Sequence, residues 1–528
     1  MPQIRNILFI MCDQLRADYL SCAGFALPLT PNIDRLAARG VRFSRAYVQS
    51  PVCGPSRMSF YTGRTVFSHG ATWNGVPLPL GEWTIADYLR PHGIRTAVIG
   101  KTHLIPDRRE MERLHIDCAS EAGQWVADGG FELWGRDDGI HPDPKDPSVS
   151  ARGGRASYNH WLRGQGYEGA NPWHDYANSA LGPGGELCSG WQMRHSRLPA
   201  RVPEAHSETA WATDEAINFI AEMGDRPWCL HLSYIKPHWP YMASPPYHAL
   251  FSSDNVPPAQ RSKSERHQAH PVYEAFMQAV VSRAFGQEAV RHNVIPTYMG
   301  LVRQVDDHVG RLMESLERLG RSADTLIVFT SDHGDYLGDH WLGEKELFHE
   351  PSVRVPLILV DPAEEARRGI VEDGLVEAID LLPTFLDALG IPADRQRLEG
   401  RSLWPALRSG SDWQGRAHVL SELDYAFYKV RTDLGLRPNE ARCLMLHTGR
   451  WKYIHHMVFR PQLFDLDSDP MELNDLGALP AYDEKCRELR DLLLARILTR
   501  RNRVTLSDAG VEQKTDASDS QGVYIGRW

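Results

Sequence analysis

Polar side chains that could do chemistry follow four apolar segments of the sequence. The four clusters are Asp13-Gln14, Lys101-Thr102-His103, Lys236-Pro237-His238 and Asp332-His333. Each preceding segment has the length and composition of a buried strand. In open α/β sheets, ligands bind outside the carboxyl ends of the strands. The four clusters are therefore predicted to converge in space, although they lie far apart in the sequence.

Together the clusters offer two carboxylates, three histidines and two lysines. Two carboxylates and an imidazole can hold a divalent cation. Lysines and further histidines around such an ion suit an anionic substrate, whose charge must be neutralised. A single carboxylate at a strand end is more often a helix cap, and a single histidine is more often structural. Four such endings in one chain favour a functional site.

A potential nucleophile lies in the run Cys53-Gly54-Pro55-Ser56-Arg57, which four residues separate from Thr62-Gly63-Arg64. This pattern, Cys-x-Pro-Ser-Arg, four residues, then Thr-Gly-Arg, resembles the sulfatase signature. A buried cysteine before a helix that begins at Pro55 would explain neither the arginines nor the strand-end clusters.

The resemblance to the sulfatases covers most of the chain. The matching segments are Asp13, Thr30 to Leu36, Gly100-Lys101-Thr102-His103, Ser331-Asp332-His333-Gly334, Lys345 and Asp469-Pro470-Met471-Glu472. Gln14 and His333 depart from the common pattern, which has Asp and Asn there. These two residues, with Asn74, resemble the phosphonate monoester hydrolase branch instead. That branch carries Tyr and Thr where this chain has Lys101 and His103.

The resemblance implies an alkaline-phosphatase-like fold and a mechanism. A maturation enzyme, the formylglycine-generating enzyme, would convert Cys53 to formylglycine (3-oxoalanine). One divalent metal, Ca²⁺ or Mn²⁺, would be bound by Asp13, Cys53, Asp332 and His333, with Gln14 as an additional neutral ligand. The hydrated aldehyde would accept the sulfuryl group and later release sulfate by collapsing back to the aldehyde, which divides the reaction into two easier steps.

The same resemblance assigns roles to the remaining residues. Arg57 would hold the hydrate, and Lys101 and Lys345 would neutralise charge on the transferring group. His238 would protonate the leaving oxygen, and His103 would accept a proton when sulfate leaves. Asn74, Lys101, His238 and Lys345 would contact the substrate. His69 and the pair His455-His456 match no motif and are interpreted as structural or surface residues.

Alternating apolar runs and amphipathic helical patterns predict an α/β fold with a mostly parallel sheet between helices. Strands are expected at 7–12, 96–100, 229–235, 325–330 and 355–360. A helix is expected at 30–39 with Thr30 as N-cap, and another along the apolar stripe from Leu301 to Leu316.

Three regions are distinguished along the chain. Residues 1–404 are predicted to form a catalytic domain that contains a loop-rich insertion at 105–200. Residues 405–501 are predicted to form a smaller C-terminal α+β subdomain, with an antiparallel sheet and a helix at about 482–499. Residues 502–528 form a tail, interpreted either as an arm between subunits of a homo-oligomer or as a loosely ordered terminus.

Composition narrows the classes of function. A formal net charge of -10 among 528 residues argues against a nucleic-acid partner. The eight cysteines form no Cys-x-x-Cys pair, so neither a disulfide framework nor a structural zinc site is expected. No stretch has the length of a membrane span, and the first apolar run is too short for a signal peptide. A cytoplasmic enzyme with no membrane partner is the simplest interpretation.

The sequence predicts an arylsulfatase-like hydrolase that acts on a small-molecule sulfate ester. The nearest alternative is a phosphonate monoester or phosphodiester hydrolase with the same nucleophile, and Lys101 and His103 favour sulfate over it. A Cys-dependent phosphatase would need Arg six residues after the cysteine, where this chain has Ser59. A non-catalytic anion-binding protein with an unmodified Cys53 is the third class.

Overall fold

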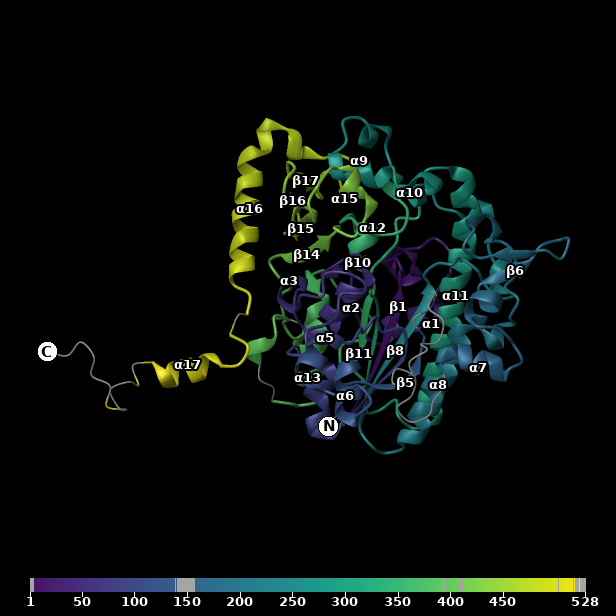
Figure 1. The fold of residues 1–528 in the computed structure, drawn as a ribbon, viewed down its shortest axis with the longest axis horizontal. Helices are drawn as coiled ribbons and strands as arrows, with labels where there is room; N and C mark the ends of the chain where they lie inside the picture. The colour runs from purple at the N-terminus through teal and green to yellow at the C-terminus, as the bar shows by residue number, and fades with distance from the viewer. Residues whose placement is uncertain are drawn as a thin grey trace.

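The computed structural model describes residues 4–137, 139, 157–392, 395–408, 413–501, 503–515, 517 and 522. Its centre is an eight-stranded sheet with the order β12-β2-β11-β9-β1-β8-β4-β5 (Figure 1). The strands of this sheet are β1 (Asn6–Asp13), β2 (Val41–Phe43), β4 (Arg95–Gly100), β5 (Glu132–Arg136), β8 (Trp228–Pro237), β9 (Thr325–Ser331), β11 (Leu357–Val360) and β12 (Ile370–Glu372).

Four neighbouring strands, β9, β1, β8 and β4, are parallel to one another. They are the four predicted strands that precede the polar clusters, so the clusters emerge at one edge of the sheet. The predicted α/β class with a mostly parallel sheet is confirmed. The predicted strand at 355–360 is interrupted at Pro356. It divides into β10 (Arg354–Val355) and β11, and β11 runs antiparallel to β9.

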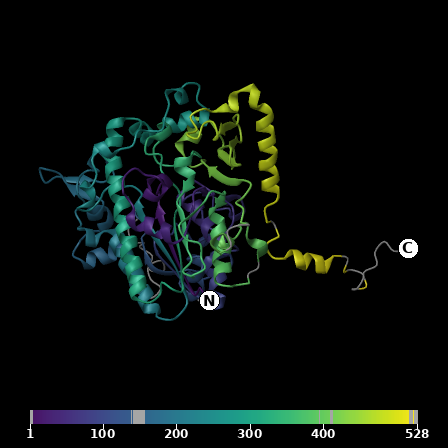
Figure 2. The same cartoon turned by 180° about the vertical axis from the view of Figure 1, so that it is seen from behind.

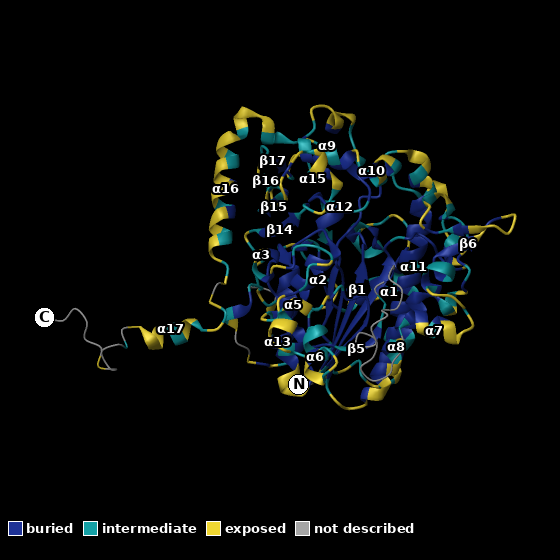
Figure 3. Cartoon of the chain, viewed as in Figure 1, coloured by how far each residue is buried: buried dark blue, intermediate teal, exposed yellow. Residues whose placement is uncertain are grey.

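Helices cover both faces of the sheet because successive side chains of a strand point to opposite sides. Ile7, Phe9 and Met11 of β1 pack into one apolar cluster, and Leu8 and Ile10 pack into the other. The second cluster is covered by α1 (Pro31–Arg39), α8 (Glu208–Met223) and α11 (Glu288–Arg318). The first is covered by α2 (Cys53–Thr62), α4 (Ile85–Leu89) and α13 (Leu381–Ala388). Figure 3 shows the strands buried between these layers.

The start of α1 differs from the sequence prediction. Thr30 lies at the N-cap position, but its side chain makes no capping bond. Instead, Asp306 of α11 accepts hydrogen bonds from the backbone N–H groups of Asn32 and Ile33, at 3.0 and 2.8 Å. A carboxylate at a helix N-terminus satisfies free N–H groups and complements the helix dipole. The cap therefore comes from a residue that no local pattern could identify.

The region 105–200 contains more regular structure than the predicted loops. Its elements are α5 (Arg108–Arg113), α6 (Glu121–Ala127), β5, α7 (Tyr158–Gly164), β6 (Ser179–Leu181) and β7 (Leu187–Ser189). Strand β5 extends the central sheet, because it pairs in parallel with β4. The weak periodicity of its sequence, Glu-Leu-Trp-Gly-Arg, is typical of an edge strand.

The C-terminal part forms the expected antiparallel sheet. Its strands are β14 (Val419–Asp424), β15 (Arg442–His447), β16 (Trp451–His456) and β17 (Gln462–Asp465). Helix α16 (Asp483–Leu498) packs on this sheet through Leu489 and Leu493. The other face of the sheet joins the apolar cluster of the large sheet through residues such as Met445 and Ile454. The boundary at residue 404 stays a prediction.

Smaller elements complete the described fold. The strands are β3 (Ala46–Tyr47) and β13 (Val376–Glu377), and β3 lies between β10 and β13 in a three-stranded sheet. The short helices are α3 (Val66–His69), α9 (Pro271–Met277), α10 (Val280–Phe285), α12 (Glu350–Val353), α14 (Trp404–Arg408), α15 (Lys429–Asp433) and α17 (Asp508–Lys514).

Figure 2 shows α17 standing away from the body of the molecule. The apolar chain end, 523–528, lies outside the described residues, so its role as an arm stays a prediction. Among the described helices, none combines the length and apolarity that crossing a bilayer requires.

A buried ion cluster ties the C-terminal sheet to the large sheet. Lys452 of β16 lies 2.8 Å from Glu350 and 2.5 Å from Glu472, and its ammonium also donates to the Phe348 carbonyl. Glu472 in turn accepts the backbone N–H of Glu350 at 2.7 Å. Glu472 is the last residue of the Asp-Pro-x-Glu element. The element therefore holds the start of α12, close in sequence to Lys345.

Replacing Lys452 with Met is expected to lower the free energy of unfolding by about 3–5 kcal/mol, because the buried Glu472 and the partly buried Glu350 lose their cation. Urea denaturation measures the change. Lys429→Met removes an exposed ion pair with Asp433 and should cost about 0.5 kcal/mol or less. Equal losses in the two variants would contradict the structural role of the cluster.

Candidate active site

Cys53 occupies the first position of α2 and is buried. The helix thus begins two residues earlier than the expected Pro55. Gly54 donates its N–H to Asn74 Oδ1 at 2.7 Å, and Ser56 Oγ donates to the Asp332 carbonyl at 2.6 Å. A Cβ at position 54 would lie 2.7 Å from Asn74 Oδ1, so glycine permits this approach. These contacts fix the start of α2 against the segment after β9.

Four ligand-type side chains surround one point beside Cys53. The donor atoms of Asp13, Cys53, Asp332 and His333 all lie within 4.8 Å of one another, and all four residues are buried. Asp13 ends β1 and Asp332 follows β9, so adjacent parallel strands bring the two carboxylates together. The predicted metal ligands are therefore assembled by the sheet.

His333 is oriented for a cation. Its Nδ1 lies 2.9 Å from the Gly334 carbonyl and its Nε2 lies 3.0 Å from Cys53 Sγ. A hydrogen bond from Nδ1 fixes the tautomer and leaves Nε2 for the cluster, as in metal-ligating histidines. Burial disfavours the imidazolium, but Asp332 and Cys53 outweigh burial and raise the pKa of His333 to about 9. The cluster thus stabilises a positive charge here, and the donor set fits a divalent ion.

Arg57 balances the two carboxylates from the opposite side. Its guanidinium lies 3.3 Å from Asp13 and 2.8 Å from Asp332. It also donates to the Lys101 carbonyl and to Ser233 Oγ, at 3.0 and 2.7 Å. The side chain is fully buried, and all of these contacts are to protein groups. Arg57 therefore orients the two carboxylates, and its contact with the hydrate at residue 53 stays a prediction.

Two lysines approach Cys53 from the side facing the cavity. Lys101 Nζ lies 3.9 Å and Lys345 Nζ 3.4 Å from Sγ, and Lys101 also forms an ion pair with Asp13. Burial and Asp13 raise the pKa of the Cys53 thiol, but the lysines and His333 outweigh them and lower it. Both cations lie where an anion attached to residue 53 would need them.

The conformation of Gly100 positions Lys101. Gly100 has φ +92°, and a Cβ there would lie 2.0 Å from the Ser233 carbonyl oxygen. Glycine is the residue that tolerates both conditions. The chain can therefore turn sharply at the end of β4 and direct Lys101 toward Asp13.

His238 contacts Lys345 at the carboxyl end of β8. Its Nδ1 lies 2.6 Å from the Trp239 carbonyl, and its Nε2 lies 3.1 Å from Lys345 Nζ. Burial, Lys345 and Lys101 hold the pKa of His238 well below its usual range, although Asp13 opposes them. In this arrangement Nε2 accepts the ammonium's hydrogen bond, so His238 is a neutral base.

A cavity of about 170 Å³ opens above Cys53. Its lining includes the predicted residues Asn74, Lys101, His103, His238 and Lys345. Gln14, the expected neutral ligand, instead accepts a hydrogen bond from Lys345 at 3.2 Å and donates to Asp335 at 2.5 Å. Every predicted site residue thus lies in the cluster, beside it, or in this cavity.

Sequence comparison identifies the family. The sequence model of the family described as Sulfatase matches residues 5–391. The chain belongs to the sulfatase family. A second model, described as N-sulphoglucosamine sulphohydrolase, C-terminal, matches residues 338–498. The predicted resemblance to sulfatases of the alkaline phosphatase superfamily is confirmed.

Individual relatives include both sulfatases and other hydrolases. The multifunctional alkaline phosphatase superfamily protein PehA of Trinickia caryophylli is 31% identical and covers 92% of this chain and 93% of its own. An arylsulfatase of Clostridium perfringens is 26% identical, with 93% of both chains covered. The phosphonate monoester hydrolase SpPMH of Silicibacter pomeroyi has a TM-score of 0.80 and 26% identity, and covers 96% of this chain and 98% of its own.

The sequence prediction missed several residues that line the cavity of this sulfatase. They are Gly139, Trp173, Ile235, Trp239, Glu344, Glu346 and Tyr428. Glu344 and Glu346 flank Lys345, so adjacency to that lysine was an available signal. Trp173 and Tyr428 come from segments with no motif, and only the tertiary fold brings them to the cavity.

The histidines without a motif lie in separate networks. His69 Nε2 lies 2.9 Å from Ser59 Oγ, and its Nδ1 accepts the Ala71 N–H at 3.2 Å. His456 stacks on His270 with ring centroids 4.0 Å apart. These contacts are structural, as expected.

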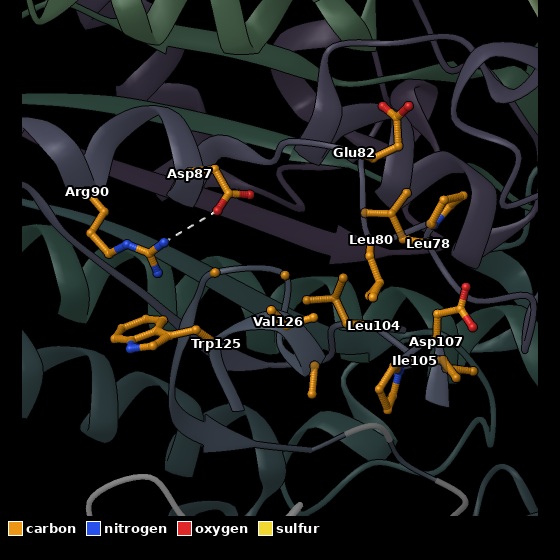
Figure 4. Close-up of a pocket in the computed structure, with 15 residues that line it drawn as sticks. Leu78, Leu80, Glu82, Asp87, Arg90, Leu104, Ile105, Asp107, Trp125 and Val126 are labelled. Carbon is orange, nitrogen blue, oxygen red and sulfur yellow. Dashed lines mark ion pairs between the residues drawn. The ribbon is translucent and has the colours of Figure 1, made fainter. Parts of the chain in front are cut away.

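A second cavity, of about 100 Å³, lies beside the segment that follows His103. Figure 4 shows its mixed lining, which includes Leu80 and Leu104 as well as the ion pair between Arg90 and Asp87. None of the predicted catalytic or metal-binding residues lines it. Leu104 and Ile105, which line it, belong to the segment that follows His103.

Alanine at His333 is expected to weaken binding of a divalent ion by more than about 100-fold, since losing an outer partner alone costs about 10–100-fold. Mn²⁺ should bind more tightly than Ca²⁺, because imidazole suits manganese better. Affinity should rise with pH toward about 9, because the ion must displace the proton from His333. Calorimetric titration of the metal-free protein measures all three effects. His455→Ala is the control, and equal affinity in both variants would refute the site.

Proposed function

We propose that this sulfatase hydrolyses sulfate monoesters, with Cys53 converted to formylglycine and a divalent metal bound by Asp13, residue 53, Asp332 and His333. One observation carries the proposal. Cys53 lies at the point where the four-residue ligand cluster meets Lys101 and Lys345. A nucleophile at this position would face both a metal and two cations, as transfer of an anionic group requires.

Formylglycine supplies a hydrate whose two hydroxyls can respectively accept the sulfuryl group and expel sulfate. When bound, the metal would supply Lewis acidity at the residue-53 oxygen and the sulfate group. Asp13 and Asp332 would hold that ion, and Arg57 orients both carboxylates through its ion pairs. For Asp13, burial opposes ionisation, but Lys101, His238 and Arg57 hold its pKa well below the usual range.

Proton transfer falls to the two histidines of the cavity. His238 would protonate the leaving oxygen, which requires an anionic ester to raise its depressed pKa and displace the Lys345 hydrogen bond from Nε2. Lys345 would then turn its ammonium to the sulfuryl oxygens. His103 would accept the proton of the second hydroxyl, because it lines the same cavity as residue 53. Asn74, held by Gly54, would orient the substrate.

A phosphonate monoester or phosphodiester hydrolase is the second candidate. It is favoured by the phosphonate monoester hydrolases among the structural relatives, the second of which, from Agrobacterium radiobacter, has a TM-score of 0.79 and 26% identity. Gln14 and His333 point to the same branch. Lys101 and His103 favour sulfate instead, because the phosphonate monoester hydrolase branch carries Tyr and Thr at these two positions.

Digestion of the protein is expected to yield a peptide around residue 53 with the mass of formylglycine instead of cysteine, provided that a formylglycine-generating enzyme is co-expressed. Aryl sulfate turnover should follow the modified fraction. Cys53→Ala should lower kcat by at least ~10³-fold. Full activity in protein whose Cys53 is intact by mass spectrometry would disprove the mechanism.

The wild-type protein is expected to have a higher kcat/KM for 4-nitrophenyl sulfate than for 4-nitrophenyl phenylphosphonate. The double variant Lys101→Tyr/His103→Thr should shift this ratio toward the phosphonate by about tenfold or more, because it carries the Tyr and Thr of the phosphonate monoester hydrolase branch at these two positions. The conservative variant Lys101→Arg is the control. A wild-type preference for the phosphonate would favour the second candidate.

A further inference from the structure

The cavity above Cys53 carries two kinds of charge. Lys101 and Lys345 lie within 3.9 Å of the nucleophile position, as an anionic group requires. The same cavity is lined by two carboxyl side chains, Glu344 and Glu346. A carboxylate beside a bound anion is unfavourable, because like charges at short range repel strongly where water is excluded. The sulfate-binding role of the cavity therefore does not explain these two residues.

The backbone holds both carboxyl groups in place. Glu344 and Glu346 have φ values of +61° and +93°, a region that residues other than glycine rarely adopt. Such strained conformations cluster at functional sites. The Tyr428 hydroxyl donates to Glu346 Oε1 at 2.8 Å and so fixes that carboxyl group further.

Aromatic rings line the same part of the molecule. Trp173, Trp239 and Tyr428 line the cavity together with the two glutamates. Tyr428 packs edge-on against Trp73, with centroids 4.5 Å apart, and Trp73 stacks on the exposed Phe427. Aromatic faces next to carboxylates are the surroundings in which organic cations bind best.

Lys345 is the neighbouring cation that opposes the raised pKa of both Glu344 and Glu346. Burial and the neighbouring Glu344 raise the pKa of Glu346 to about 8, although Lys345 opposes them. Burial likewise raises the pKa of Glu344. Lys345 cannot serve both glutamates fully, because it also faces Cys53, Gln14 and His238. A second cation in the cavity would favour the ionised form of both carboxyl groups.

We propose that Glu344 and Glu346, with Trp173, Trp239 and Tyr428, form a subsite for an organic ammonium group on the alcohol part of the substrate. This inference rests on the proposed sulfatase function. The substrate would then be a small sulfate ester with the anion at Cys53 and a cation a few bonds away, since the cavity measures about 170 Å³. The sulfate end of such an ester would meet Lys101 and Lys345, and its ammonium end would meet Glu344 and Glu346.

The alternative role for the glutamates is to position Lys345. In that case they would act equally on every sulfate ester, whatever its alcohol. A pair of substrates with the same shape and different charge separates the two roles. The pair is 2-(trimethylammonio)ethyl sulfate and its neutral isostere, 3,3-dimethylbutyl sulfate.

The wild-type kcat/KM is expected to be at least about tenfold higher for the ammonium ester. In Glu344→Gln/Glu346→Gln this ratio should fall toward one, while kcat/KM for the neutral isostere changes little. Glutamine keeps the shape and can still accept the Tyr428 hydrogen bond. Glu422→Gln, at a buried carboxyl outside this cavity, should keep the wild-type ratio. Adding 2-aminoethyl sulfate shows whether a quaternary or a primary ammonium is preferred.

A wild-type ratio near one, or equal losses for both esters in the double variant, would overturn the subsite. Failure of the sulfatase proposal has a different signature, which is no turnover of any sulfate ester, 4-nitrophenyl sulfate included. Calorimetry then tests the subsite by itself, with choline and 3,3-dimethylbutan-1-ol as probes. Tighter binding of choline that is lost in the double glutamine variant supports the subsite. Equal binding of the two alcohols overturns it.

Discussion

The balance of buried charge around Arg57 is the constraint on which the site depends. Asp13 and Asp332 are fully buried, and burying two carboxylates side by side is costly unless cations compensate them. Arg57 neutralises them from within the protein. Lys101 adds a cation from the cavity side, where it pairs with Asp13. The two carboxylates are therefore paired with cations on two sides, within the donor set that is proposed to hold a divalent ion.

The central sheet makes this donor set rigid. Asp13 and Asp332 extend from neighbouring parallel strands, and α2 is pinned to the same strand ends by Ser56 and Arg57. A reacting group placed at Cys53 thus has little freedom, which is what preorganised catalysis requires. Lys345 has a different support, because its segment is held by α12 and the buried Lys452 cluster of the C-terminal sheet. The smaller sheet therefore helps to place a cation of the site.

Different residues of the cavity wall would bind the sulfuryl group and the alcohol part of the substrate. Lys101 at a strand end, together with Lys345, places cations around residue 53 that would act on any sulfuryl group. Residues from later segments, such as Glu346 and Tyr428, line the cavity and would meet the alcohol in the proposed subsite. This division follows from the fold, because strand ends are rigid and connecting segments vary freely. Chemistry and specificity can then change independently.

The sequence by itself identified the residues of the candidate site and most of the sheet. Short motifs specified Cys53, Asp13, Asp332, His333 and the two lysines, because those positions are defined by chemistry and by local strand-to-turn geometry. The sequence also located the four parallel strands, because their continuous apolar runs indicate strands that are buried on both faces of the sheet. It could not determine contacts between distant segments. The Asp306 cap of α1, the edge strand β5 and the antiparallel β11 all depend on partners remote in the chain.

The same limit applied within the site. The sequence identified Arg57 by its place in a motif, but only the packed structure shows that its guanidinium pairs with two carboxylates. The sequence named Lys345 but not the glutamates beside it, because a charged residue has no functional signature until its surroundings are known. Only the tertiary structure decided which charges lie in one low-dielectric cavity. There, distance and burial, rather than position in the chain, set the pKa values and the ligands that the side chains can hold.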